Sequence, residues 1–197
     1  MYSMNFAMEA ADGRQRGDYE CALCSVEKGL AHYPDNELLL NLEGVIRLDL
    51  SHYELARECF LKHLNRDKQS PSIRPLTLNN IAWANFMLDD ATLLDEADGC
   101  SRKAMESMGW LPALRGTRGA VLAAMGRFEE ALPMLHGALA QADNASSKAN
   151  NACLIAMVET KRGNPDEARN YLKEARRLNP KCPLLARAEQ AVRDASA

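Results

Sequence analysis

The chain has 197 residues, of which 47% are hydrophobic and 6% aromatic, and its net charge is −3. A composition with so few aromatic side chains, together with many Ala and Leu residues, predicts an all-α protein. The acidic balance disfavours nucleic acid as the main ligand. No apolar run reaches the roughly 18 residues that a membrane-spanning helix needs, and the first residues lack a signal-peptide pattern. We therefore expect a cytoplasmic protein without direct membrane insertion, with its six cysteines as reduced thiols.

Apolar residues recur at helical spacing along most of the chain. In chain order, the pattern predicts helices at about 4–15, 19–32, 37–49, 53–66, 74–88, 94–108, 112–125, 128–141, 147–161 and 165–178, and a last helix near 183–194. Asp18 and Asn164 suit N-caps, and Gly126 suits the residue just after a helix end. Pro133 falls in the second turn of its helix, where we expect it to bend the helix or delay its start.

The same helix pair recurs along the chain. Small residues of the second helices are Ala22, Ala56, Ala97, Ala131 and Ala168, spaced 34, 41, 34 and 37 residues apart. Small residues of the first helices are Ala10, Gly44, Ala82, Gly119 and Ala156. In the third unit, three extra residues around Asp89-Asp90-Ala91 lengthen the turn. A period near 34 indicates helix-turn-helix repeats that bury their apolar faces by stacking on neighbours.

This pattern resembles the tetratricopeptide repeat family, which places a small residue in the first helix and an Ala twelve residues later in the second. The turn Gly126-Arg127-Phe128 and the prolines Pro34 and Pro180 at repeat ends fit the same family. The resemblance implies an all-α, right-handed superhelical solenoid of about five helix pairs with a C-terminal capping helix. We expect one domain over 1–197, with repeats at about 3–36, 37–70, 75–111, 112–145 and 149–182, and the cap at 183–194.

No arrangement typical of catalysis or of metal binding is present in the sequence. The pair Cys21 and Cys24 has the spacing of half a zinc site, but no second Cys-x-x-Cys or paired His follows it. The four histidines lack partners at metal-ligand or catalytic-triad spacing. We therefore expect neither an enzyme nor a cofactor or metal site.

The resemblance implies that the first helices line a concave groove where solenoids of this kind receive ligands. The phase of the repeat assigns to this groove Asn41, Val45, Leu48, Asn79, Trp83, Phe86, Met87, Asn150 and Met157. Trp83, Phe86 and Met87 would form an apolar pocket. The asparagines would make hydrogen bonds to a peptide backbone, because an amide offers both a donor and an acceptor. The alternative is that the aromatic rings pack between helices and that the asparagines stabilise turns.

These features favour a non-catalytic scaffold that binds an apolar or amphipathic peptide segment of a protein partner. The alternative is a soluble regulatory or tethering tail of a larger, possibly membrane-anchored bacterial protein. RNA binding by a related two-helix repeat predicts basic first helices, yet residues 75–111 carry two Lys/Arg against six Asp/Glu. A homodimer through the N-terminal end is a further hypothesis, because Met1, Tyr2, Met4, Phe6 and Met8 crowd that end.

Overall fold

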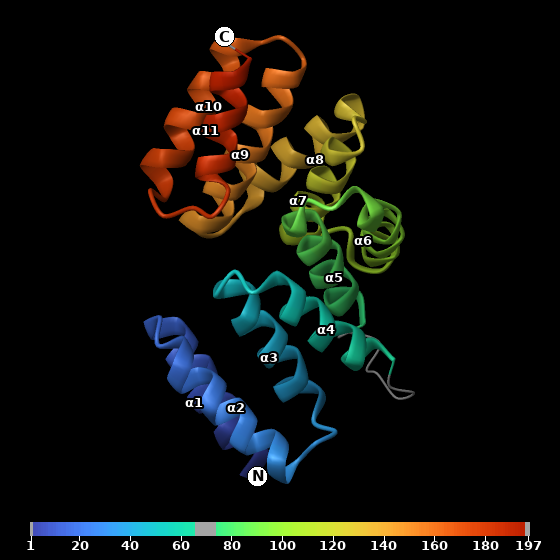
Figure 1. Ribbon diagram of the computed structural model, residues 1–197, viewed down its shortest axis with the longest axis vertical. Coiled ribbons are helices and arrows are strands. Elements are labelled where there is room, and N and C mark those ends of the chain that lie inside the picture. The colour runs from blue at the N-terminus through green and yellow to red at the C-terminus, as the bar shows by residue number, and fades with distance from the viewer. Residues whose placement is uncertain (1, 66–73, 196–197) are drawn as a thin grey trace. The chain divides into compact units, whose positions relative to one another are not determined.

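The structure is a computed structural model that describes residues 2–65 and 74–195. Over these residues it consists of α-helices, one short 3₁₀ helix, turns and no strand (Figure 1). The helices are α1 (Tyr2–Arg16), α2 (Tyr19–His32), α3 (Glu37–Asp49), α4 (Tyr53–Leu64), α5 (Arg74–Leu88), η1 (Ala91–Leu93), α6 (Leu94–Met108), α7 (Pro112–Ala124), α8 (Phe128–Gln141), α9 (Ala145–Lys161), α10 (Pro165–Leu178) and α11 (Leu185–Asp194). The all-α prediction is confirmed.

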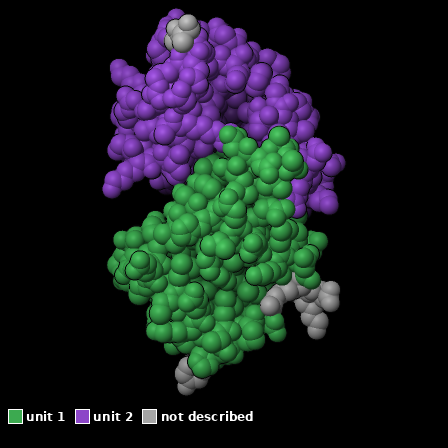
Figure 2. Space-filling model, in the orientation of Figure 1, with its two compact units in different colours: residues 1–93 green, residues 94–197 purple. Residues whose placement is uncertain are grey.

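The chain divides into two compact units, residues 1–93 and 94–197, which Figure 2 shows in green and purple. In unit 1, α1 packs on α2, α3 packs on α4, and α4 packs on α5. In unit 2, α6 packs on α7, α7 on α8, and α9 on α10, while α11 lies against both α9 and α10. The terminal helix therefore covers the last repeat as a cap. The single domain over 1–197 stays a prediction.

The helix bounds follow local capping signals. Asp18 caps α2, since its carboxylate accepts a hydrogen bond from the backbone N of Cys21 at 3.2 Å. The helix α9 begins two residues before its predicted start because the side chain of Asn144 accepts from Ser147 N at 2.8 Å. The cap α11 begins two residues late, after a turn in which Asn179 Oδ1 accepts from Lys181 N at 3.0 Å.

The expectation that Pro133 delays the start of its helix is wrong, because α8 begins at Phe128 as the pattern predicts. The expected bend stays a prediction. The first turn of α8 closes before the proline, with Ala131 N donating to Arg127 O at 3.0 Å. Pro133 thus lies inside a helix whose start is already fixed.

The small residues of the repeat occupy the contacts between helices. The five second-helix alanines are all 0% exposed, as are Ala10, Ala82 and Ala156 of the first helices. At Gly44, an added Cβ would lie 2.6 Å from the ring of Phe60, and at Gly119 it would lie 2.6 Å from Leu135 Cγ. Glycine is therefore required at both crossings for the helices to approach this closely, and the predicted register is confirmed.

Each first helix ends in a left-handed residue. The φ angles are 78° at Gly17, 60° at Ser51, 56° at Asp89, 76° at Gly126 and 79° at Gly163. In four of these turns the next residue donates its N–H to the carbonyl five residues back, as Arg127 does to Leu122 at 2.9 Å. After Asp89, the extra residues of the third unit form η1, and Asp90 accepts from Thr92 N at 2.9 Å. Hydrogen bonds from Thr92 lower the pKa of the Asp90 carboxyl.

These turns give opposite predictions for two substitutions. Because a left-handed conformation costs a non-glycine residue roughly 1 kcal/mol, Gly126→Ala is expected to lower the free energy of unfolding by about 1 kcal/mol. Ser51→Gly, at a position where serine has a φ of 60°, is expected to change it little or to raise it. Urea unfolding of both variants measures the difference, and an equal loss in the two would contradict the assignment.

Candidate functional site

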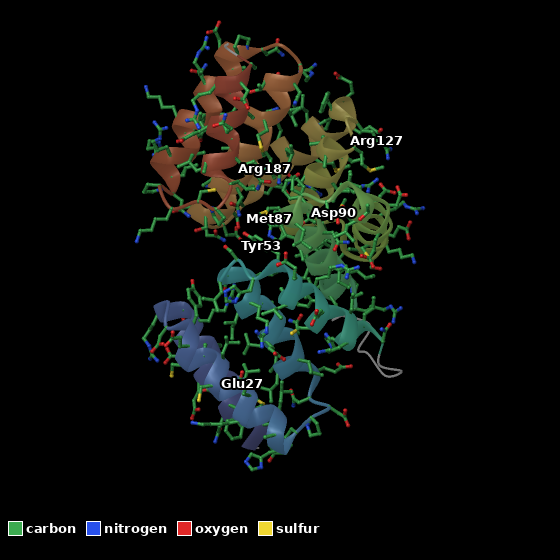
Figure 3. The ribbon with its side chains drawn as sticks, in the orientation of Figure 1. Glu27, Tyr53, Met87, Asp90, Arg127 and Arg187 are labelled. Carbon is green, nitrogen blue, oxygen red and sulfur yellow. The ribbon has the colours of Figure 1, made fainter. Side chains whose placement is uncertain are left out.

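The predicted groove residues of unit 1 lie on two helices, α3 and α5, which contact each other. We call the surface that they form the α3–α5 face, made up of Asn41, Val45, Leu48, Asn79, Trp83, Phe86 and Met87. Val45 and Leu48 are half-buried on α3, and Trp83 and Met87 are half-buried on α5. Figure 3 labels Met87 near the end of α5. Leu38, at the start of α3, is 51% exposed.

The two aromatic rings of this face have different surroundings. The centroids of Trp83 and Phe86 lie 5.5 Å apart and their planes are tilted by 36°. Phe86 is only 4% exposed, whereas Trp83 is half-buried. Phe86 therefore contributes to the core beneath the face, where its ring contact supports the indole of Trp83.

The asparagines of the face differ from the other buried asparagines in their partners. Asn41 Oδ1 is buried without a hydrogen-bond partner among the described residues. Asn79 is 8% exposed, and its Nδ2 reaches Asn80 Oδ1 at 3.5 Å, the limit of a hydrogen bond. By contrast, Asn85 accepts from Arg57 Nε at 2.8 Å. The expectation that such amides stabilise turns does not fit Asn41 or Asn79, which both lie within helices.

The remaining predicted groove residues, Asn150 and Met157, lie on α9 in unit 2. Met157 is half-buried, and Asn150 Oδ1 accepts a hydrogen bond from Cys182 Sγ at 3.1 Å. Ala120 has the same repeat position as Trp83, and Cys153 has that of Asn79; both are 0% exposed. In unit 2, α11 packs on α9, and the hydrogen bond from Cys182 connects Asn150 to the segment before α11.

Several exposed apolar residues lie outside the predicted groove. Trp110, in the turn between α6 and α7, is 65% exposed, and its place two residues before a helix-starting proline is the sequence signal that marks it as a loop residue. Met4 and Met8 of α1 are 63% and 65% exposed. Phe6 is half-buried and stacks on His32, with ring centroids 6.1 Å apart, so it belongs to the packing of unit 1.

The described cysteine and histidine side chains do not cluster as a metal site would require, and the thiol of Cys59 is held in its protonated form. In the part of the chain that the structure describes, no group of three or more His, Cys, Asp or Glu side chains is placed to hold a metal ion. Burial, together with the nearby Glu43 carboxylate, raises the pKa of Cys59 to about 11, so this thiol stays protonated and is a poor nucleophile at neutral pH. None of the described helices is long and apolar enough to cross a lipid bilayer.

Comparison with known proteins connects this geometry to a family. Residues 111–181, which contain α7 to α10, match the family model described as tetratricopeptide repeat. No curated protein matches the sequence.

Solved structures share the fold at low sequence identity. TTC0263, a thermophilic TPR protein of Thermus thermophilus, is 22% identical, with 96% of this chain and 98% of that chain covered and a TM-score of 0.71. A tetratricopeptide repeat protein from Parabacteroides merdae is 17% identical, covering 95% of this chain and 70% of that chain at a TM-score of 0.67. YrrB, described as a TPR protein with an unusual peptide-binding site, is 18% identical, covering 94% of this chain and 90% of that chain at a TM-score of 0.56.

Proposed function

We propose that this tetratricopeptide repeat protein, matched by the family model over residues 111–181, is a non-catalytic scaffold whose α3–α5 face binds an apolar or amphipathic peptide segment of a protein partner. The fold supports a protein-interaction scaffold. YrrB, which has the same fold, is described as having a peptide-binding site, and this supports a peptide as the ligand class. The role as a tail of a larger protein and the homodimer through α1 stay predictions.

The observation that carries the proposal is the unused hydrogen-bonding capacity of Asn41 and Asn79. Asparagine inside a helix is less favourable than alanine by about half a kcal/mol, and a buried acceptor without a partner costs about 1–3 kcal/mol. Asn41 Oδ1 is such an acceptor within the described part of the chain, and the amide of Asn79 reaches Asn80 at 3.5 Å. A peptide backbone, which carries donors and acceptors along its length, would satisfy the Asn79 amide directly and the Asn41 oxygen once that side chain turns toward the face.

The side chains beside these amides supply the apolar part of the interface. Trp83 presents part of its indole at the surface and is held from below by Phe86. Tryptophan side chains of this kind contribute strongly to binding because they bury a large area and lose little conformational entropy. Val45, Leu48 and Met87 are half-buried on the same face, so a peptide with one apolar side fits it better than a highly charged one.

The two tryptophans of the chain provide a direct test. In a Trp110→Phe variant, Trp83 is the single fluorescent indole, so a peptide bound on the α3–α5 face shifts its emission. We expect peptides of about 12 residues, long enough to span several side chains of a groove and selected from a displayed random library on the wild-type chain, to be apolar or amphipathic and to produce this shift. Trp83→Ala is expected to weaken their binding at least tenfold, or about 1.4 kcal/mol.

The matched control is Trp110→Ala, which removes a tryptophan that is 65% exposed in unit 2 and is expected to leave the affinity unchanged. If the selected peptides bind Trp83→Ala as tightly as wild type, or if they leave the emission of Trp83 unaltered, the site assignment is wrong. Highly charged selected peptides would contradict the ligand class.

A further inference from the structure

Two buried cysteines of unit 2 lie side by side although they are far apart in the sequence. Cys153 lies on α9, and Cys182 lies in the turn between α10 and α11. Their Sγ atoms are 3.8 Å apart. Cys153 is 0% exposed and Cys182 is 5% exposed. Of the other cysteines, Cys21 and Cys24 are exposed, and Cys59 and Cys100 are half-buried.

We propose that Cys153 and Cys182 are a redox-active dithiol that closes to an intramolecular disulfide by exchange with a small-molecule disulfide. The sulfurs must approach by roughly 1.8 Å to reach the bonded distance of about 2.05 Å. Cys182 lies in a turn in which Asn179 accepts hydrogen bonds from Lys181 N and Cys182 N. Closure needs the Cys182 side chain to rotate toward Cys153 of α9. This inference is independent of the peptide site.

The surroundings of the pair make Cys182 the attacking group. The hydrogen bond with Cys153 and the backbone N–H groups of Leu184 and Leu185 lower the pKa of the Cys182 thiol. The same interaction, together with burial, raises the pKa of Cys153. Glu189 of α11 also raises the pKa of Cys153, and this carboxylate is itself paired with Arg176 of α10 at 2.5 Å. Because Cys182 is 5% exposed and Cys153 is 0% exposed, Cys182 is the thiol that a small disulfide reaches first; after loss of its proton it attacks, and Cys153 is the resolving thiol.

The exchange proceeds in two balanced steps. The Cys182 thiolate attacks one sulfur of the small disulfide, which forms a mixed disulfide and expels one thiolate. Cys153 then loses its proton to that thiolate and attacks Cys182 Sγ, which expels the second thiolate. Two protein thiols are oxidised to one disulfide, and the small disulfide is reduced to two thiols.

Closure would have two structural consequences. It would link α9 covalently to the segment before α11, and α11 already packs on α9. It would also remove the S–H group that Cys182 donates to Asn150 Oδ1. The disulfide would thus fasten the cap to the last repeat and leave the Asn150 amide without this donor.

The test uses the full chain and glutathione disulfide as the probe. After incubation, alkylation and tryptic digestion, we expect peptides 149–161 and 182–187 to be joined, with a mass loss of two hydrogen atoms in the intact protein. The oxidised form is expected to melt about 5–10 °C higher, because a crosslink across a loop of this length constrains the unfolded chain. Dithiothreitol should reverse both changes.

Two variants make the result specific. Cys21→Ser/Cys24→Ser removes the exposed cysteines of α2 and should leave the joined peptide in place. Cys182→Ser should abolish the joined peptide and leave the Cys153 thiol available for alkylation after denaturation. Circular dichroism checks that this variant folds. A stable glutathione adduct at Cys182 without closure would overturn the proposal, and so would reaction confined to Cys21 and Cys24.

Discussion

Gly44→Val is expected to lower the free energy of unfolding of unit 1 by about 3 kcal/mol, because overpacking a filled helix crossing forces the backbone apart. Even the first added carbon would lie 2.6 Å from Cε1 of Phe60. Phe60 is 0% exposed, so its ring lies in the core and a shift would disturb the side chains packed around it. Urea unfolding followed by the fluorescence of Trp83 in a Trp110→Phe background measures unit 1, since Trp83 is then the single indole.

Gly99→Ala is the matched control for this prediction. Gly99 also lies inside a helix, α6, but an added Cβ there has no neighbouring atom within 4 Å among the described residues. Alanine is favoured over glycine in a helix interior by about 0.5–1 kcal/mol, so we expect this variant to be slightly more stable than wild type. A loss at Gly99→Ala similar to that at Gly44→Val would contradict the view that the close crossing at Gly44 decides the outcome.

The helices and their register could be predicted because the signals that set them are local. The small residues repeat with the stacking contacts, and Asp18 lies three residues before the N–H that it caps. Asn164 shows the limit of such signals. It stands at the N-cap of α10 as expected, yet it makes no side-chain cap bond, and its Nδ2 donates to Glu159 Oε2 at 2.6 Å. The choice between these partners depends on the packed structure.

The candidate site was harder to predict because exposure depends on tertiary packing. Phe86 follows Trp83 by three residues and shares its side of α5, yet one ring is 4% exposed and the other half-buried. Asn150 has the same repeat position as Leu38, but in the structure it accepts a bond from Cys182, which is 32 residues away. A cysteine pair separated by 29 residues likewise leaves no mark on the local sequence pattern.

The repeat also gave no sign of the division into two units. The repeat continues on both sides of residues 89–93, where one unit ends and the next begins. The extra residues of the third repeat were visible in the sequence, and they form η1. A change in repeat spacing predicts the length of a turn. It does not predict where the contacts along the chain divide into separate units.

The double variant Asn79→Ala/Trp83→Ala is expected to weaken binding of the selected peptides by at least 100-fold, about 2.7 kcal/mol. The two residues are one helical turn apart on α5, so one peptide segment would contact both. Since neighbouring contacts couple, we expect the double loss to differ from the sum of the single losses. Isothermal titration calorimetry of wild type, the two single variants and the double variant measures this coupling.

The free energy of unfolding of each variant distinguishes a lost binding contact from a misfolded chain. Asn79 makes a bond at 3.5 Å, the limit for a hydrogen bond, so its replacement by alanine should leave the free energy of unfolding unchanged or raise it slightly. Asn85→Ala, which strips Arg57 Nε of an acceptor at 2.8 Å, should lower stability by about 1–3 kcal/mol. It should retain binding under conditions where the variant remains folded. If Asn79→Ala instead destabilises the chain as Asn85→Ala does while peptide affinity is kept, then the Asn79 amide serves the core, and the α3–α5 face is not the peptide site.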